Sequence, residues 1–149
     1  MRQFRRFFLV ASLLAVGVQI SQAGNNQMST KFDTIKTMYD SFNARDIDGV
    51  VSRLTDDVQW ANGMEGGYVQ GHDGVRTYWT HQWSLVQPTV TPLNYSQAAD
   101  GAVVVEVNQV IKDKNGQPHH VLGLTDKVVT HIFHFADEKV SRFDIGDSK

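Results

Sequence analysis

Several short segments in the second half of the chain alternate apolar and polar residues, which is the pattern of strands with one buried side. Two pairs that favour tight hairpin turns, Asp100-Gly101 and Asn115-Gly116, separate these segments. Helical spacing is confined to the residues before Pro88. We therefore expect an α+β domain in which helices precede a meander of antiparallel strands. The expected strands are residues 58–62, 89–96, 101–112, 118–135 and 139–146.

Three helices are expected before the main run of strands. Apolar residues recur at three- and four-residue steps from Phe32 to Phe42, which predicts one buried helix face. Thr30 and Asp33 have the spacing of a capping box at its start. Asp46 can cap a short second helix, and His72-Asp73-Gly74 opens a third. The inner stripe of the third helix is predicted to be Val75, Tyr78, Trp79 and Gln82 or Trp83.

The segment between the second and third helices is expected to hold one strand and one loop. Thr55-Asp56-Asp57 should turn the chain before the strand at 58–62. In that strand Val58, Trp60 and Asn62 share one side. The segment from Gly63 to Gly71 contains four glycines and no regular period, so it should be a loop or a tight hairpin.

Length and composition fit one globular domain. The chain has 149 residues, 41% hydrophobic and 20% charged, which allows one buried core but hardly two. It contains no cysteine, which excludes disulfides and thiolate metal sites. The formal net charge is −2 and no basic patch is present, so we expect no nucleic-acid partner.

Residues 1–23 have the three parts of a secretory signal peptide. Three arginines give a positive start, an apolar run follows from Phe7 to Ile20, and small residues lead to Ala23. We expect cleavage after Ala23, a flexible lead-in at 24–30, a domain at 31–149, and a periplasmic or secreted product. The apolar run is shorter than the roughly 20 residues that span a bilayer, so no stable membrane span is expected in the mature form. Arg5-Arg6 also fits the twin-arginine export route.

Four groups of residues keep a recognisable order and spacing over about residues 30–146. They are Asn43-Ala44-Arg45-Asp46-Ile47-Asp48-Gly49, Asp56-Asp57-Val58-Gln59-Trp60, Gly71 before a helix with Tyr78-Trp79, and Phe133-His134-Phe135 before a turn and Val140. This pattern resembles the nuclear transport factor 2-like superfamily, in its SnoaL-like and ketosteroid-isomerase-like branch. The resemblance implies a cone, with N-terminal helices packed in the concave face of a strongly curved, mostly antiparallel sheet, and a homodimer. The superfamily includes isomerases, dehydratases, polyketide cyclases, epoxide hydrolases and non-catalytic modules, so the fold alone does not give the function.

The resemblance also allows a comparison with the isomerase site. The carboxylate that moves the proton corresponds here to Asn62, the tyrosine donor on the first helix to Met38, and the protonated aspartate on a late strand to His131. An amide cannot accept a proton at neutral pH, and a thioether is a poor donor to an oxyanion. Because all three groups are changed, we expect no steroid isomerisation.

His131 is the candidate catalytic residue. It shares a strand face with Val129 and Phe133, and this face should point inward. An ordinary histidine pKa of about 6.5 would suit acid–base chemistry near neutrality. The competing interpretation is a half-buried histidine bonded to a neighbouring side chain.

Five other residues are candidates for ligand binding. Asn62 either orients a ligand carbonyl or a water, or ends its strand and satisfies loop amides. Tyr78 is either a donor in a pocket or a core aromatic. Trp60 and Trp79 would offer a flat wall to a ring-shaped ligand, although such a stripe is more often core. Tyr39 follows the position of the isomerase donor on the first helix.

The sequence contains no recognisable metal or cofactor motif. His131 and His134 should lie on opposite sides of a strand, and the adjacent His119 and His120 point apart. No His-Glu-x-x-His spacing occurs. Gly66-Gly67 is better explained as a turn than as a phosphate-binding loop. We therefore expect no metal and no cofactor.

Two functions remain open from sequence. In the first, the exported protein holds a small hydrophobic molecule in the cone and performs cofactor-free proton transfer, such as isomerisation, dehydration or cyclisation. His131 would be the acid–base group, with Asn62 and Tyr78 positioning the ligand. In the second, the protein is a non-catalytic ligand-binding or dimerisation module, which the loss of the isomerase groups favours.

Cleavage after Ala23 predicts that N-terminal sequencing of the exported protein begins at Gly24. Replacing Arg5 and Arg6 together by lysine should block processing only if export uses the twin-arginine route. An exported protein that still begins at Met1 would contradict the predicted signal peptide.

Overall fold

The computed structural model describes residues 15–119 and 126–146, with side chains from residue 22 onward. The order of its elements confirms the expected α+β class. The elements are α1 (Ala15–Asn43), α2 (Ile47–Val51), β1 (Leu54–Ala61), β2 (Tyr68–Gln70), α3 (Gly71–Leu85), β3 (Gln87–Gln97), β4 (Val103–Lys112), β5 (Lys127–Ala136) and β6 (Lys139–Gly146).

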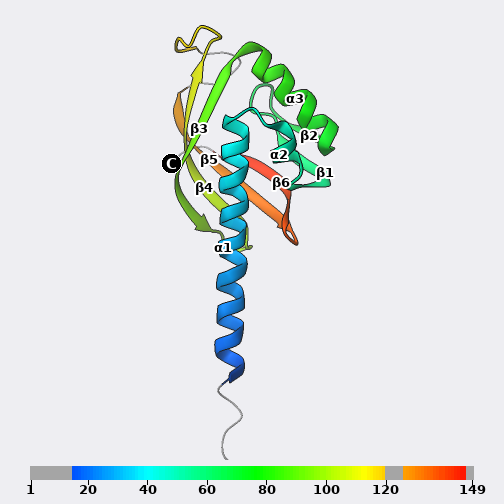
Figure 1. Ribbon diagram of the computed structural model, residues 1–149, viewed down its shortest axis with the longest axis vertical. Coiled ribbons are helices and arrows are strands. Elements are labelled where there is room, and N and C mark those ends of the chain that lie inside the picture. Colours follow the sequence, from blue (N-terminus) through cyan, green and yellow to red (C-terminus); the bar gives the residue numbers. More distant parts are fainter. Residues whose placement is uncertain (1–14, 120–125, 147–149) are drawn as a thin grey trace, which may run out of the picture.

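The strands form one six-stranded sheet in the order β2-β1-β6-β5-β4-β3. Neighbouring strands are antiparallel except β1 and β6, which are parallel. Figure 1 shows the sheet curving around the C-terminal half of α1, with α2 and α3 beside its β1–β2 end. The helices therefore cover the concave face, as the resemblance implied.

Helix α1 buries one face against the sheet. Ile35, Met38 and Tyr39 are buried at the predicted helical spacing. The helix is 29 residues long. Among the residues that the structure describes, however, no helix carries a stretch long and apolar enough to cross a membrane.

The start of α1 differs from the prediction. Residues 24–30, expected to be a flexible lead-in, are helical, and Figure 1 shows this part of α1 projecting beyond the sheet. Thr30 does not form a capping box with Asp33, because its Oγ1 donates to the carbonyl of Asn26 at 2.9 Å inside the helix. Once the packed half of the helix has formed, each added residue gains a hydrogen bond at little cost, so a polar sequence does not stop it.

A glycine fixes the junction that follows α1. Asp46 caps α2, as predicted, by accepting the Gly49 N–H through Oδ1 at 2.9 Å. A Cβ at Gly49 would lie 2.2 Å from Oδ2 of Asp46, so the cap requires glycine at this position. The cap therefore fixes where α2 begins, next to the end of the buried half of α1.

Most strand predictions are confirmed to within a few residues. Gly63 to Gly71 contains the predicted hairpin, which includes the short strand β2. Asp100-Gly101 lies in the turn between β3 and β4, where Gly101 has a φ of 86°. Of the predicted strand at 118–135, residues 120–125 lie outside the described part of the chain, and β5 begins after them.

The predicted turn at Thr55-Asp56-Asp57 is wrong, because these residues belong to β1. The flanking side chains of Leu54 and Val58 are fully buried and hold the segment against the core. The register between β1 and β6 shifts between Leu54 and Gln59, so the strand is irregular there without leaving the sheet. Burial of the flanking residues therefore outweighs the turn-forming composition.

Leu54→Ala should lower the free energy of unfolding by about 2–5 kcal/mol, because Leu54 is fully buried and its truncation leaves a cavity. Leu93→Ala is the matched control, since Leu93 is 57% exposed on β3 and should change stability by less than about 0.5 kcal/mol. Urea unfolding of both variants measures the difference. Equal losses would contradict this description of the core.

Candidate functional site

A cavity lies between α1, α3 and the concave face of the sheet. Its volume is about 70 Å³, roughly half of the ~150 Å³ of an engineered apolar cavity that admits benzene. The wall is mostly apolar, and it includes seven aromatic residues, two glutamines and one histidine. The aromatic residues are Tyr39, Phe42, Trp60, Tyr78, Trp79, Phe133 and Phe143, and the polar ones are Gln82, Gln109 and His131.

His131 is held in this wall by a hydrogen bond from another element. It lies on β5 between Val129 and Phe133 on the inward face, as predicted, and is 7% exposed. Its Nδ1 lies 3.0 Å from the hydroxyl of Tyr39 on α1. The edge of its ring meets Phe143 with centroids 4.8 Å apart. The imidazole is therefore fixed on one side and surrounded by apolar rings on the others.

The direction of this hydrogen bond follows from counting donors and acceptors. If Tyr39 donates to Nδ1, only the Nε2–H of the neutral ring remains without a partner among the described residues. If Nδ1–H donated instead, both the tyrosine hydrogen and the Nε2 lone pair would remain without one. The first arrangement leaves fewer buried groups unpaired, so Nε2 carries the proton. His131 then presents an N–H donor on its remaining side.

Burial keeps this imidazole uncharged. Desolvation lowers the pKa of His131 to about 3, so the ordinary value near 6.5, on which the sequence argument for acid–base chemistry relied, does not apply. Protonating the ring here costs about 5 kcal/mol more than in water, at about 1.4 kcal/mol per pH unit. Burial also raises the pKa of Tyr39, so its hydroxyl keeps the hydrogen that it donates.

A second polar group lies on α3. The Tyr78 hydroxyl accepts hydrogen bonds from the Gly63 N–H and from Nε2 of Gln82, both at 3.1 Å. Burial raises the pKa of Tyr78 to about 12, so it too remains protonated. Gln82 is 5% exposed, and its Oε1 is a buried atom without a hydrogen-bond partner within the described residues. This helix therefore presents a hydroxyl and an amide to the cavity.

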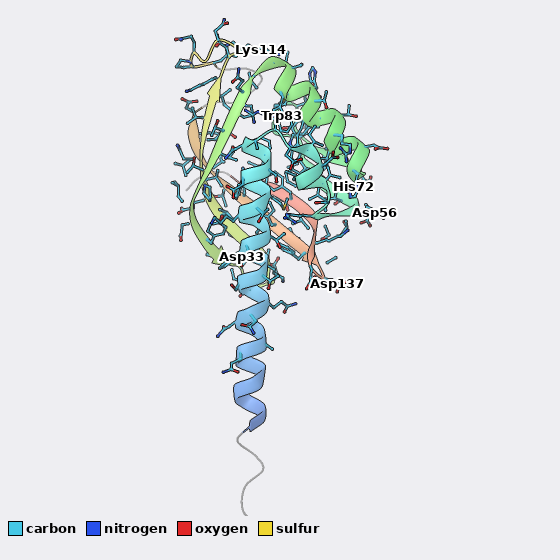
Figure 2. The ribbon with its side chains drawn as sticks, in the orientation of Figure 1. Asp33, Asp56, His72, Trp83, Lys114 and Asp137 are labelled. Atoms are coloured by element: carbon cyan, nitrogen blue, oxygen red, sulfur yellow. The ribbon has the colours of Figure 1, made fainter. Side chains whose placement is uncertain are left out.

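The two predicted tryptophans line the cavity and are also core residues. Trp60 stacks on Phe143 with centroids 4.1 Å apart, and it meets Trp79 edge-on at 5.1 Å. Trp83, the alternative inner position on α3, does not line the cavity. It lies near the C-terminal end of α1, against Phe42 (Figure 2).

Asn62 lies outside the cavity that the other candidates line. Its Oδ1 accepts the backbone N–H groups of Met64 and Glu65, both at 3.0 Å, so the side chain orders the hairpin loop. It lines a separate pocket of about 440 Å³ between this loop and α3, in which Tyr78 forms part of the wall. The structure thus brings His131, Tyr39, Tyr78 and the two tryptophans together, but not Asn62.

Sequence reasoning missed Gln82 as a polar site residue. It was placed on the inner stripe of α3, and an amide at an inward position among apolar residues was the available signal. Gln109 of β4 lines the same cavity, and its place in the alternation of Val103, Val105 and Val107 was the available signal. Over the described ranges, no three histidine, aspartate or glutamate side chains form a group that could hold a metal ion.

The histidine on the opposite sheet face lies in an ionic cluster. His134 Nε2 is 3.2 Å from Asp144 Oδ2, and Arg142 Nε is 2.9 Å from the same oxygen. Tyr68 also donates to Asp144. Partial burial alone would raise the pKa of Asp144, but the hydrogen bonds from Tyr68 and Arg142 outweigh it and hold the pKa below its usual range. This cluster ties β2, β5 and β6 together outside the cavity.

A family model described as SnoaL-like domain matches residues 35–143. No match was found among curated protein sequences. The matched range contains every aromatic and polar residue named above for the cavity wall.

Three solved structures illustrate the shared fold. An NTF2-like protein of unknown function from Burkholderia pseudomallei has a TM-score of 0.67 and 22% identity, over 80% of this chain and 91% of its own. TerC, co-crystallised with polyporic acid, has a TM-score of 0.67 and 23% identity, over 80% and 92%. A putative polyketide cyclase from Sinorhizobium meliloti has a TM-score of 0.62 and 18% identity, over 76% and 94%. At these identities the likeness shows the fold.

Stability should fall as the pH drops, because of His131. The unfolded chain binds a proton at this residue near pH 6.5, whereas the folded chain binds it only near pH 3. The contribution of His131 to the free energy of unfolding is therefore fully present above pH 6.5 and is lost as the pH falls from 6.5 to 3. On going from pH 7 to pH 5, the free energy of unfolding should fall by about 2 kcal/mol.

Urea unfolding at both pH values should show this loss reduced in His131→Gln and retained in His81→Gln, which replaces an exposed histidine of α3. An unchanged pH dependence in His131→Gln would contradict a buried neutral imidazole.

Proposed function

The chain belongs to the SnoaL-like domain family, and on that premise we propose that its cavity binds a small, largely apolar ring compound that carries a carbonyl group. The observation that carries this proposal is the neutral His131, whose Nδ1 is occupied by Tyr39 and whose other nitrogen remains for a ligand. An apolar wall with few polar groups is the usual composition of a small-molecule site.

A ligand carbonyl oxygen would supply the hydrogen-bond acceptor that the Nε2–H of His131 lacks. A ligand acceptor facing Nε2–H would gain a hydrogen bond that no described residue makes there. Trp60 and Trp79 offer ring faces and edges to the apolar part of the ligand. His131 would therefore recognise the polar group of the ligand and the tryptophans would contact its apolar part, with Tyr39 positioning the imidazole.

Binding a ring requires the cavity to enlarge, because its 70 Å³ is smaller than the ~150 Å³ that admits benzene. Tyr78 forms the wall that this cavity shares with the 440 Å³ pocket beside the hairpin loop. Its hydroxyl connects α3 to the loop through the Gly63 N–H. A movement of Tyr78 and the loop would join the two spaces, and in this proposal it gives the ligand its route.

Cofactor-free proton transfer is a second candidate, and the Tyr39–His131 hydrogen bond favours it. In such reactions of carbonyl compounds, for example isomerisation, dehydration or cyclisation, a proton leaves the carbon beside the carbonyl and an oxyanion forms; here the proton would pass to water or hydroxide, because none of the described residues that line the cavity is a carboxylate. A neutral imidazole N–H can stabilise the oxyanion that forms, as in other enzymes that keep such a histidine uncharged. His131 would then act first as a donor, since its low pKa makes it a weak base.

The similar structures support both candidates. TerC was co-crystallised with polyporic acid, and another similar structure is a putative polyketide cyclase. Both share the fold of this chain, so a small organic ligand is consistent with that fold. Export directed by residues 1–23 and assembly as a homodimer remain part of the proposal.

The bicyclic ketone 1-tetralone and its carbonyl-free analogue tetralin test the role of His131. The wild type should bind 1-tetralone about tenfold more tightly than tetralin in calorimetric titrations, because only the ketone accepts the Nε2–H hydrogen bond. His131→Leu should remove this difference. His134→Leu is the matched control, since His134 lies on the opposite sheet face.

Deuterium uptake by bound 1-tetralone, followed by NMR in heavy water, separates the two candidates. Uptake that the wild type accelerates and His131→Leu abolishes supports proton transfer. Binding without accelerated uptake supports a ligand-binding module alone. If neither compound binds, or if the ketone has no advantage in the wild type, the proposed role of His131 is wrong.

A further inference from the structure

A second pocket lies between the hairpin loop and α3, and Tyr78 is the one described residue that it shares with the cavity around His131. Its volume is about 440 Å³, within the roughly 300–1,000 Å³ of typical small-molecule sites. The cavity around His131 must enlarge before it admits a ring, whereas this pocket has room for one as it stands.

One side of the pocket is apolar. Met64 and Tyr78 are each 8% exposed, Val69 is partly buried, and all three line the pocket. These side chains come from the hairpin loop, from α3 and from β2. A ring placed against them would exchange contact with water for apolar contact.

The loop that forms part of this side is held in place by its own hydrogen bonds. Asn62 Oδ1 accepts the N–H groups of Met64 and Glu65, both at 3.0 Å. The Asn62 N–H donates to the Gly67 carbonyl at 2.9 Å, and Gly66 and Gly67 supply the φ values of 80° and 71° that close the turn. A ligand therefore meets side chains that are already positioned, which lowers the entropy cost of binding.

The rim of the pocket is negatively charged. Glu65 of the loop and Asp73 in the first turn of α3 both line it, and both are exposed. Neither forms an ion pair with a described residue, and no described lysine or arginine lines the pocket. Burial is the main cause of the raised pKa of Tyr78, and the charge of Glu65 adds to it, which places that carboxylate near the apolar side. The pocket thus combines an apolar wall with two carboxylates that lack a cation.

We propose that this pocket is a second binding site, for a small organic amine that carries an apolar ring. The ring would pack against Met64, Val69 and Tyr78, and the ammonium group would face Glu65 and Asp73. An anion of the same shape would be repelled by both carboxylates. This site goes beyond the proposed function, since it requires no ligand in the other cavity.

The test compares 2-aminotetralin, tetralin and tetralin-2-carboxylate, which share one ring system and differ in charge. At pH 7, where the amine is protonated, calorimetry should show 2-aminotetralin binding about tenfold more tightly than tetralin, because two exposed ion pairs contribute about threefold each. The carboxylate should bind more weakly than tetralin. Raising the salt concentration from about 0.02 M to about 0.5 M should reduce the advantage of the amine. Methylammonium, which has the charge without the ring, should show no measurable binding, because exposed ion pairs alone are weak.

The double variant Glu65→Gln with Asp73→Asn should abolish the advantage of the amine and leave the affinity for tetralin within about twofold. Asp137→Asn with Glu138→Gln is the matched control, because it removes the same two charges from exposed residues of the turn between β5 and β6. This control should retain the full advantage.

Two methionines report which space a ligand occupies. Met64 lines the pocket beside the hairpin loop, and Met38 lines the cavity around His131. Their ¹³C-labelled methyl groups, each assigned by its loss on substitution with leucine, give the two spaces separate NMR signals. 2-Aminotetralin should shift the Met64 signal and leave Met38 unchanged, whereas 1-tetralone should shift Met38.

Equal affinities for 2-aminotetralin and tetralin would overturn the amine site. So would an advantage that persists in Glu65→Gln with Asp73→Asn, or an amine that shifts Met38 but not Met64. If 1-tetralone does not bind while the amine shifts Met64, the proposed function is wrong and the amine site stands.

Discussion

The hydrogen bond between Tyr39 and His131 is the interaction on which the site depends. It joins the buried face of α1 to the inward face of β5 over a distance of 3.0 Å. Without it, an imidazole surrounded by Phe133 and Phe143 would have no polar contact among the described residues. With it, the neutral ring is stable, its tautomer is fixed, and one N–H remains for a ligand. One contact between a helix and a strand therefore sets both the charge and the orientation of the candidate catalytic group.

The same aromatic residues build the core and the cavity wall. Trp60 contacts Trp79, Phe133 and Phe143, and each of these four lines the cavity while being almost fully buried. This packing explains why the cavity is small. It also places the polar groups on separate elements, with His131 on the sheet and Gln82 and Tyr78 on α3. A ligand between them would contact the two layers of the domain at once, which links ligand binding to packing between α3 and the sheet.

Much of this arrangement could be predicted from sequence, because it follows from periodicity. The inward placement of His131 followed from its alternation with Val129 and Phe133, and the buried stripe of α3 followed from helical spacing. The helical start of α1 and the strand at Thr55-Asp56-Asp57 were not predicted. There, local composition favours loops and turns, while neighbouring packed segments impose regular structure.

Properties that arise only from contacts distant in sequence could not be predicted. Tyr39 and His131 are 92 residues apart, so neither the hydrogen bond nor the low pKa of His131 has a local signal. Asn62 was placed correctly at the end of its strand, but its side chain turns to the hairpin loop instead of the cavity. Gln82 was placed on the correct helix face, but that its amide lines the cavity depends on α1 and the sheet, which close the space around it.

The state of the His131 ring is the central claim, and nitrogen NMR of the imidazole tests it most directly. The ¹⁵N signals of His131, assigned by their loss in His131→Gln, should show a neutral ring with the hydrogen on Nε2 at every pH from about 5 to 8, well above a pKa of about 3. Addition of 1-tetralone should shift the Nε2 signal and leave the tautomer unchanged. A ring that becomes protonated near pH 6.5, or one that carries its hydrogen on Nδ1, would contradict the account.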